Sequence, residues 1–158
     1  MRHEQPPSGD QLFQASFSNS PEEVRAALDQ VDQALRALHL PEEERFSVEL
    51  VLAETLNNIV EHAYDRPDSG QIALRLSADS GGILCQLTDN GRAMPGGALP
   101  KGARVDPEVE TALLPEGGFG WFLIREIARD LTYERASDMN VLNFRIAVGP
   151  VSTQAVAI

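Results

Sequence analysis

Residues 47–64 read Ser47-Val48-Glu49-Leu50-Val51-Leu52-Ala53-Glu54-Thr55-Leu56-Asn57-Asn58-Ile59-Val60-Glu61-His62-Ala63-Tyr64, and this stretch decides the fold of the chain. Its apolar residues return every three or four positions, at Val48, Leu52, Leu56, Ile59 and Ala63. That spacing places them on one stripe of a helix, where they can face a core. Pro41 and the three glutamates after it suit a helix start, so the pattern predicts an amphipathic helix over residues 41–64.

A second row of side chains follows the same helix. Glu54, Asn58 and His62 lie four residues apart, which lines up a carboxylate, a carboxamide and an imidazole on another side of the helix. Polar residues at this spacing are usually a solvated face, and that interpretation stays open at this point. The pair Asn57-Asn58 favours a site, because asparagine is a poor helix former and a merely soluble face would carry Lys, Glu or Arg.

The composition indicates one globular domain and excludes some kinds of partner. A chain of 158 residues is long enough for one domain with a core and too short for two. The formal net charge of -11 would repel nucleic acids and anionic membranes, so neither is an expected partner. A small polyanion such as a nucleotide is still compatible, because backbone N–H groups, a helix N-terminus or a divalent cation can hold its phosphates.

The cysteine content and the termini add three expectations. Cys85 is the one cysteine and lies in an apolar run, so a buried structural thiol is expected rather than a disulfide or a thiolate metal cluster. Residues 1–9 are polar, contain Pro and Gly, and predict a flexible tail without a signal segment. No segment reaches the length of a membrane span, and we expect a cytoplasmic protein.

Strands and helices follow one another in an order typical of an α+β domain. Ser20-Pro21-Glu22-Glu23 has the form of a capping box and predicts a helix that begins there. Besides the helix over 41–64, the patterns predict a strand at 12–17, a helix at 20–38, a hairpin of strands 71–77 and 83–88, a helix opened by residues 116–120, and a closing hairpin of strands 131–135 and 141–148. The domain is expected over residues 10–148, with residues 149–158 as a C-terminal tail.

A long segment between these elements is rich in Gly and Pro, from Gly91 to Gly118. Residues 106–113 could form a short helix within it. Compact domains seldom carry such long connections unless they act as lids or are disordered. We interpret residues 92–117 as a lid.

Two further features point to a bound nucleotide. Asp89 ends a strand and is followed by Gly91, where the backbone can approach a flat ring while the carboxylate accepts a hydrogen bond from an amino group. Gly117, Gly118 and Gly120 open a helix, where backbone N–H groups can surround an anion, although a plain flexible turn before a helix would look the same. No Walker A loop is present, and Leu123 stands where the dinucleotide fingerprint needs its last glycine.

Three boxes in order resemble a known superfamily. Glu54-Thr55-Leu56-Asn57-Asn58-Ile59-Val60-Glu61-His62-Ala63-Tyr64 is similar to the N-box E-x-x-x-N-x-x-x-H-x-Y, Asp89 to Pro95 to the box D-x-G-x-x-x-P, and Gly117 to Ile124 to the second glycine box. Together they resemble the GHKL or Bergerat-fold ATPases and kinases, and within them the anti-sigma factor serine/threonine kinases of the RsbW and SpoIIAB type. The resemblance spans roughly residues 10–148. It implies an α+β two-layer sandwich whose mixed, mostly antiparallel sheet is covered on one face by helices.

The resemblance also implies a role for each box residue. Glu54 would be the catalytic base, Asn58 the ligand of Mg²⁺, and Asp89 the reader of the adenine amino group. The residues that the resemblance places at the ATP are Asn58, Asp89, Gly91, Met94, Lys101, Gly117, Gly118, Phe119, Gly120 and Asn143. Lys101 or Arg104 of the lid could reach the γ-phosphate, although an exposed loop cation is more often merely solvated.

Some box positions carry weaker expectations. His62 and Tyr64 match the N-box, but packing and hydrogen bonding are their expected roles. Asn143 stands where family members often have a threonine in the last strand, so the polar support of Asp89 can differ here.

The leading interpretation is a protein serine/threonine kinase that uses ATP and Mg²⁺ and acts as an anti-sigma factor. By resemblance, its substrate would be an anti-anti-sigma protein with a STAS domain, a sigma factor is a second candidate partner, and the protein would form a homodimer. The alternative is a non-catalytic module in which ATP orders the lid and so regulates a protein partner. The catalytic half of a histidine kinase is disfavoured because no phosphoacceptor helical hairpin precedes the domain, and ATP-driven clamps because their transducer domains are absent.

Overall fold

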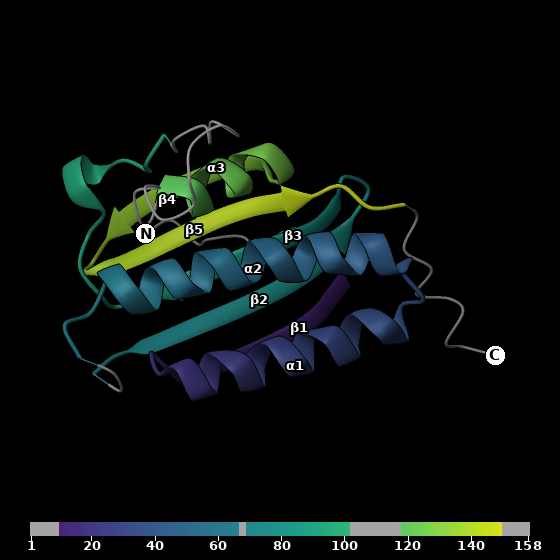
Figure 1. The fold of residues 1–158 in the computed structure, drawn as a ribbon, viewed down its shortest axis with the longest axis horizontal. Coiled ribbons are helices and arrows are strands. Elements are labelled where there is room, and N and C mark those ends of the chain that lie inside the picture. The colour runs from purple at the N-terminus through teal and green to yellow at the C-terminus, as the bar shows by residue number, and fades with distance from the viewer. Residues whose placement is uncertain (1–9, 67–68, 102–117, 150–158) are drawn as a thin grey trace, which may run out of the picture.

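The protein folds as one layer of sheet beneath one layer of helices (Figure 1). The computed structural model describes residues 10–66, 69–101 and 118–149. The strands are β1 (Asp10–Ser18), β2 (Gln71–Asp79), β3 (Gly82–Asp89), β4 (Arg129–Ala136) and β5 (Met139–Ile146). The helices are α1 (Pro21–Ala37), α2 (Glu42–His62), the short 3-10 turn η1 (Pro95–Gly97) and α3 (Gly118–Ile127).

The five strands form one sheet in the order β1-β2-β3-β5-β4, and each of the four pairings is antiparallel. The strands β3 and β5, far apart in the sequence, lie side by side in the middle of the sheet. Their register places Asp89 opposite Asn140 and Leu87 opposite Leu142. The end of β3, where the sequence places a candidate carboxylate, is therefore next to the start of β5.

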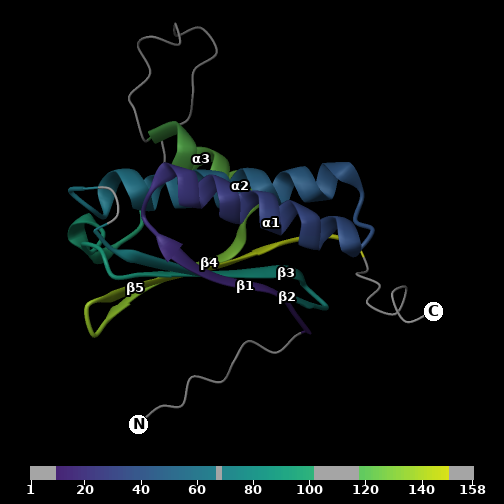
Figure 2. The same ribbon diagram turned by 90° about the horizontal axis from the view of Figure 1, so that it is seen from below.

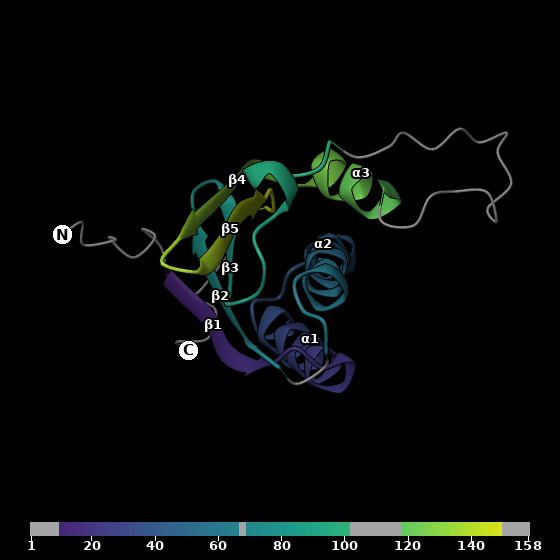
Figure 3. The same ribbon diagram turned by 90° about the vertical axis from the view of Figure 1, so that its left-hand side faces the viewer.

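All three longer helices lie over the same face of the sheet, as two views of the ribbon show (Figures 2 and 3). On β5 the even-numbered residues Asn140, Leu142, Phe144 and Ile146 are buried beneath the helices, whereas the odd-numbered ones are partly exposed on the other face. Such alternation follows from the two-residue period of a strand. The two-layer α+β sandwich with helices on one face is confirmed.

Helix α1 begins as its capping pattern predicts. The Ser20 side chain accepts a hydrogen bond from the Glu23 N–H at 3.2 Å, and Pro21 occupies the first turn. The Glu23 carboxylate reaches back to the N–H of Ser18 at 2.8 Å, two residues before the cap, rather than to that of Ser20.

Helix α2 lies between α1 and α3 and supplies much of the core. It runs within one residue of the predicted start and two of the predicted end, and its buried apolar residues are Val48, Val51, Leu52, Leu56 and Ile59. At its end the Ala63 N–H bonds the Ile59 carbonyl, and the Arg92 N–H bonds the Ala63 carbonyl at 2.8 Å. The end of α2 is thereby tied to the segment that follows β3.

Some predicted segments lie outside the described residues: the tail at 1–9, the short helix at 106–113, lid residues 102–117 with Arg104 and Gly117, and 150–158 of the C-terminal tail. The tail and lid assignments stay predictions. Among the described helices, none combines the length and the apolar character needed to cross a membrane. Cys85 is fully buried in the core, as expected.

Candidate functional site

A cavity of about 610 Å³ opens between helix α2, the ends of β3 and β5, and the segment after β3. Its volume lies within the range of sites for small molecules and cofactors. Its lining is Thr55, Asn58, Ile59, His62, Ala63, Asp89, Arg92, Ala93, Met94, Pro95, Pro100, Trp121, Tyr133, Asn140 and Leu142. Most of this lining is apolar, with a few polar groups, which suits a flat ring with polar edges.

Asp89 is the buried acid of this cavity and is only 4% exposed. Its Oδ1 accepts two hydrogen bonds of 2.9 Å, from the Gly91 N–H and from Asn140 Nδ2. Burial raises the pKa of the Asp89 carboxyl above its ordinary value, while the bonds from Asn140 and Gly91 and the charge of Arg135 act in the opposite direction. Within the described part of the chain, no protein group donates to Oδ2, so this oxygen is left to accept from a ligand.

Asn140 is the centre of the polar contacts around Asp89. Its Nδ2 also donates to the Arg92 carbonyl at 2.8 Å, and its Oδ1 accepts from the Tyr133 hydroxyl at 2.6 Å and from Arg135 at 3.1 Å. The side chain is 5% exposed, so these bonds replace water around a buried amide. The last two strands thus hold the turn that follows Asp89.

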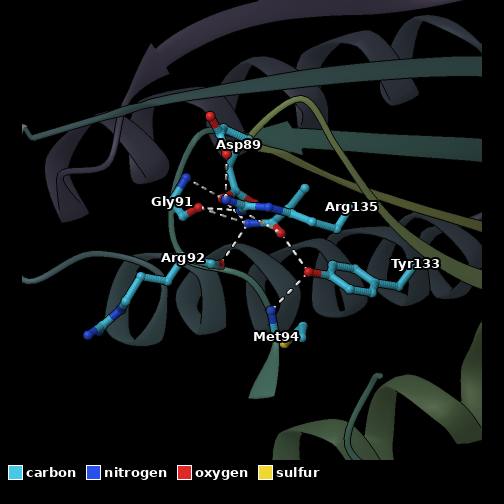
Figure 4. Close-up of polar contacts among 8 residues, drawn as sticks. Asp89, Gly91, Arg92, Met94, Tyr133 and Arg135 are labelled. Carbon is cyan, nitrogen blue, oxygen red and sulfur yellow. Dashed lines mark hydrogen bonds and ion pairs between the residues drawn. The ribbon is translucent and has the colours of Figure 1, made fainter. Parts of the chain in front are cut away.

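Tyr133 and Arg135 extend these contacts from β4 (Figure 4). The Tyr133 hydroxyl accepts the Met94 N–H at 2.9 Å, and Arg135 donates to the Gly91 carbonyl at 2.6 Å. Figure 4 shows Asp89, Gly91, Arg92, Met94, Tyr133 and Arg135 gathered about this one cluster of hydrogen bonds. The backbone from residue 91 to 94 is therefore fixed at three points by side chains of β4 and β5.

Gly91 is a glycine because its backbone passes close to α2. A Cβ at this position would lie 2.6 Å from both the Ala63 Cβ and the Ala63 carbonyl oxygen, closer than van der Waals contact allows. Tyr64 supports the same turn, since its hydroxyl donates to Asn90 Oδ1 at 2.7 Å. The structure thus gives Tyr64 a hydrogen-bonding contact, in keeping with the supporting role expected for it.

Asn58 lines the cavity on the side of α2, and Glu54, one turn earlier on α2, lies next to Gly120 of α3. Asn58 is 9% exposed, and its Nδ2 donates to the Glu54 carbonyl at 2.8 Å, whereas its Oδ1 accepts from no group in the part of the chain that the structure describes. A Cβ built on Gly120 would lie 2.7 Å from Glu54 Oε2 and 3.5 Å from Asn58 Nδ2. The first turn of α3 therefore packs directly on the polar row of α2.

The structure brings together part of the predicted set. Asn58, Asp89 and Met94 line the cavity, Gly91 bonds Asp89, and Gly120 contacts Glu54, which does not itself line the cavity. Gly118 and Phe119 begin α3, and Gly117 lies outside the described residues. Lys101 is exposed beside the lining residue Pro100.

Asn143 does not lie at the cavity. Odd-numbered residues of β5 face away from the helices, and Asn143 is paired with Gln86 and Thr132 in the sheet. The polar support of Asp89 comes from Asn140, three residues earlier and on the opposite face. A nucleotide contact by Asn143 stays a prediction that this geometry does not support.

Sequence reasoning missed Asn140, Tyr133, Arg135 and Trp121. Asn140 lies between the two predicted strands of the closing hairpin, but in the structure it is the second residue of β5, and its contact with Asp89 spans 51 residues of sequence. A strand register was needed to find it. Trp121 was within reach, because it follows Gly120 in the glycine-rich helix start, and it is 3% exposed at the cavity wall.

The chain resembles a known protein family and several solved structures. The family model of the histidine kinase-like ATPase domain matches residues 17–146. The histidine kinase domain of a blue-light activated histidine kinase from Erythrobacter litoralis EL346 has a TM-score of 0.49 and 22% identity, covering 85% of this chain and 64% of that one. The RsbU and RsbW domains of Rv1364c from Mycobacterium tuberculosis have a TM-score of 0.54 and 12% identity, covering 88% of this chain and 34% of that one.

The chain spans less than two thirds of the length of either solved structure. At 12% identity, the likeness to the Mycobacterium tuberculosis structure shows a shared fold and nothing about activity. No curated protein matches the sequence.

Proposed function

Because the chain belongs to the histidine kinase-like ATPase domain family, we propose that it is an ATP-dependent protein serine/threonine kinase that acts as an anti-sigma factor. ATP binding and a kinase-like domain come with the family. The serine/threonine specificity, the anti-sigma role and a STAS-domain substrate are the proposal. They rest on the three sequence boxes, on Glu54 in the first of them, and on the cavity around Asp89.

The observation that carries the proposal is the state of Asp89. A carboxylate that is 4% exposed, with one oxygen that accepts from no group of the described residues, is costly to fold. An adenine ring repays that cost, since its amino group donates to the free oxygen while its faces meet apolar side chains. Ile59, Met94, Trp121 and Leu142 supply that apolar lining.

The donor set also fits magnesium held together with a nucleotide. Asn58 offers one amide oxygen, and the described residues hold no cluster of three or more His, Cys, Asp or Glu side chains that could bind a metal on its own. Mg²⁺ accepts few protein ligands and keeps water and phosphate oxygens in its shell. Bound with ATP at Asn58, it would neutralise phosphate charge.

Glu54 is suited to act as a base at the phosphate end of the site. Its carboxylate lies against Gly120 in the first turn of α3, where N–H groups and the helix dipole favour phosphate. In the proposed step, the hydroxyl oxygen of a Ser or Thr on the partner attacks the γ-phosphorus, and the bond to the β–γ bridging oxygen breaks. The hydroxyl proton passes to Glu54, and ADP leaves with the electrons of the broken bond.

From the resemblance to RsbW-type kinases we propose three partners: a STAS-domain protein as substrate, a sigma factor as second partner, and a second copy of this chain in a homodimer. The likeness in fold to a structure that includes an RsbW domain is compatible with this choice.

The second candidate is an ATP-sensing module without phosphoryl transfer. One observation favours it: Glu54 is not among the residues that line the cavity. Both functions require ATP binding, and only the first requires a base.

Phosphate transfer to a panel of STAS-domain proteins separates the two. With Mg-ATP, we expect phosphoserine or phosphothreonine by mass spectrometry, and Glu54→Gln should lower the transfer rate by roughly 100- to 10,000-fold with ATP affinity retained. Glu61→Gln, an exposed position two turns along α2, is the matched control and should transfer as the parent does. Transfer by Glu54→Gln at the parent's rate would refute the base, and ATP binding without transfer to any partner would favour the module.

A further inference from the structure

The hydrogen-bond partners of the Asn140 side chain determine how its amide is oriented. Arg135 can only donate, whereas an ionised Asp89 and the backbone carbonyls can only accept. Asn140 Oδ1 must therefore face Arg135 at 3.1 Å, and Nδ2 must face Asp89 at 2.9 Å. A flipped Asn140 amide would break both contacts, so the partners themselves determine which atom is the oxygen and which is the nitrogen.

The direction of the Tyr133 hydroxyl follows in the same way. The Met94 N–H can only donate, so the Tyr133 oxygen accepts at 2.9 Å, and its proton points to Asn140 Oδ1 at 2.6 Å. Hydrogen bonds thus run without a break from the Met94 amide through Tyr133 and Asn140 to Asp89. Bonds in such a chain polarise and strengthen one another.

This chain decides which part of Asp89 is offered to a ligand. Oδ1 already takes two donors, the Gly91 N–H and Asn140 Nδ2. Oδ2 has no donor among the described residues, and Asp89 lines the cavity. Without Asn140, the carboxylate could rotate and water could compete for either oxygen.

We propose that Asn140 and Tyr133 are positioning residues that set base specificity, because they hold Asp89 with Oδ2 as an acceptor beside a fixed Met94 backbone. The ligand class is a purine nucleotide with an amino group at carbon 6. The inference rests on the proposed ATP binding and adds residues of β4 and β5 to it. Neither residue takes part in phosphoryl transfer.

The test compares two triphosphates that differ in that one amino group. Binding of ATP and of purine riboside 5′-triphosphate, which lacks it, is measured by calorimetry for the parent, Asn140→Ala and Tyr133→Phe. The ratio of the two affinities is the readout, because a general loosening of the fold weakens both alike. We expect a parent ratio of roughly tenfold to hundredfold, the value of one hydrogen bond to a charged group, falling by roughly tenfold in Asn140→Ala and severalfold in Tyr133→Phe.

The control is Gln86→Ala, which changes a side chain on the opposite face of β3 and should keep the parent ratio. Tyr133→Phe removes a single oxygen, so its affinity ratio tests the positioning role if Asn140→Ala does not fold. A second readout is hydrogen exchange at the Met94 amide, which should speed up in Tyr133→Phe.

The outcomes separate the inference from the function on which it rests. A parent that binds neither triphosphate overturns the proposed function. A parent that binds both equally, or a variant of Asn140 or Tyr133 that keeps the parent ratio, overturns the positioning role while leaving ATP binding intact.

Discussion

At the scale of single residues, the buried carboxyl of Asp89 makes the site unfavourable for folding when no ligand is bound. Burial raises the pKa of the Asp89 carboxyl, so the ionised form of Asp89 works against folding. Because the folded-state pKa lies above the unfolded value, this cost is absent below the unfolded pKa and grows as the pH rises towards the folded-state pKa. A buried group with a perturbed pKa is typical of a binding site, where a ligand interacts with a side chain that destabilises the folded protein.

The adjacent Asn57 and Asn58 on α2 should differ in their effect on the binding of magnesium with ATP. Asn58 is buried with its Oδ1 available, whereas Asn57 is exposed. We expect Asn58→Ala to lose most of the gain in ATP affinity that Mg²⁺ provides, because the protein's oxygen ligand is removed. Asn57→Ala should keep that gain. Calorimetric titrations of ATP with and without Mg²⁺ measure it for both variants.

The loss of one buried hydrogen bond should also cost Asn58→Ala about 1 kcal/mol of stability, so circular dichroism is needed to show that the variant is folded. An undiminished effect of Mg²⁺ in folded Asn58→Ala would exclude Asn58 as a ligand.

At the scale of elements, α2 carries two functions on two faces. Its apolar stripe builds the core, and Asn58 and His62 line the cavity. Both faces were predictable because helical periodicity is local information. Asn140 was not, because its place depends on how β5 pairs with β3, and a shift of one residue would have turned Asn143 towards the helices instead.

The packing of α1 against α2 contains a pair of acidic residues whose effect should depend on pH. Burial, and then the neighbouring Asp32 carboxyl, raise the pKa of Glu49 to about 7, while Arg45 and Arg36 oppose the shift. Arg36 lowers the pKa of Asp32. The folded-state pKa of Glu49 lies above its unfolded value, so the stability gained from its protonated form is present at low pH and is lost as the pH rises through about 7.

We therefore predict that Glu49→Gln becomes more stable relative to the parent as the pH rises from 6 to 8. Urea denaturation of both proteins at the two pH values measures the difference. Glu43→Gln, at an exposed position of the same helix, should track the parent across this interval. If the unfolding free energies of the parent and of Glu49→Gln change by the same amount between pH 6 and 8, the raised pKa of Glu49 is contradicted.

At the scale of the whole molecule, the sheet order explains why the site lies where it does. The chain places β5 rather than β4 beside β3, so residues from the second helix, the third strand and the last hairpin meet at one end of the sheet. The helices, the strands and the three boxes were predictable from local spacing and resemblance. The hydrogen-bonded cluster of Asn140, Tyr133 and Arg135 was not, since it exists only once strands distant in sequence are paired.

A single substitution tests whether the molecule as a whole is built around an ATP site. Asp89→Asn keeps the shape of the side chain and can still accept from Gly91 and Asn140 through its oxygen. It places an NH₂ group where adenine needs an acceptor. Because it removes a buried charge whose pKa is raised, its unfolding free energy should not fall below that of the parent, so lost binding would not reflect lost folding.

The most direct measurement is a calorimetric titration of the parent and of Asp89→Asn with Mg-ATP. We predict that the parent binds one ATP per chain and that Asp89→Asn binds at least about tenfold more weakly, the loss of one hydrogen bond to a charged acceptor. No binding by the parent, or equal affinity in folded Asp89→Asn, would contradict the assignment of this cavity to ATP.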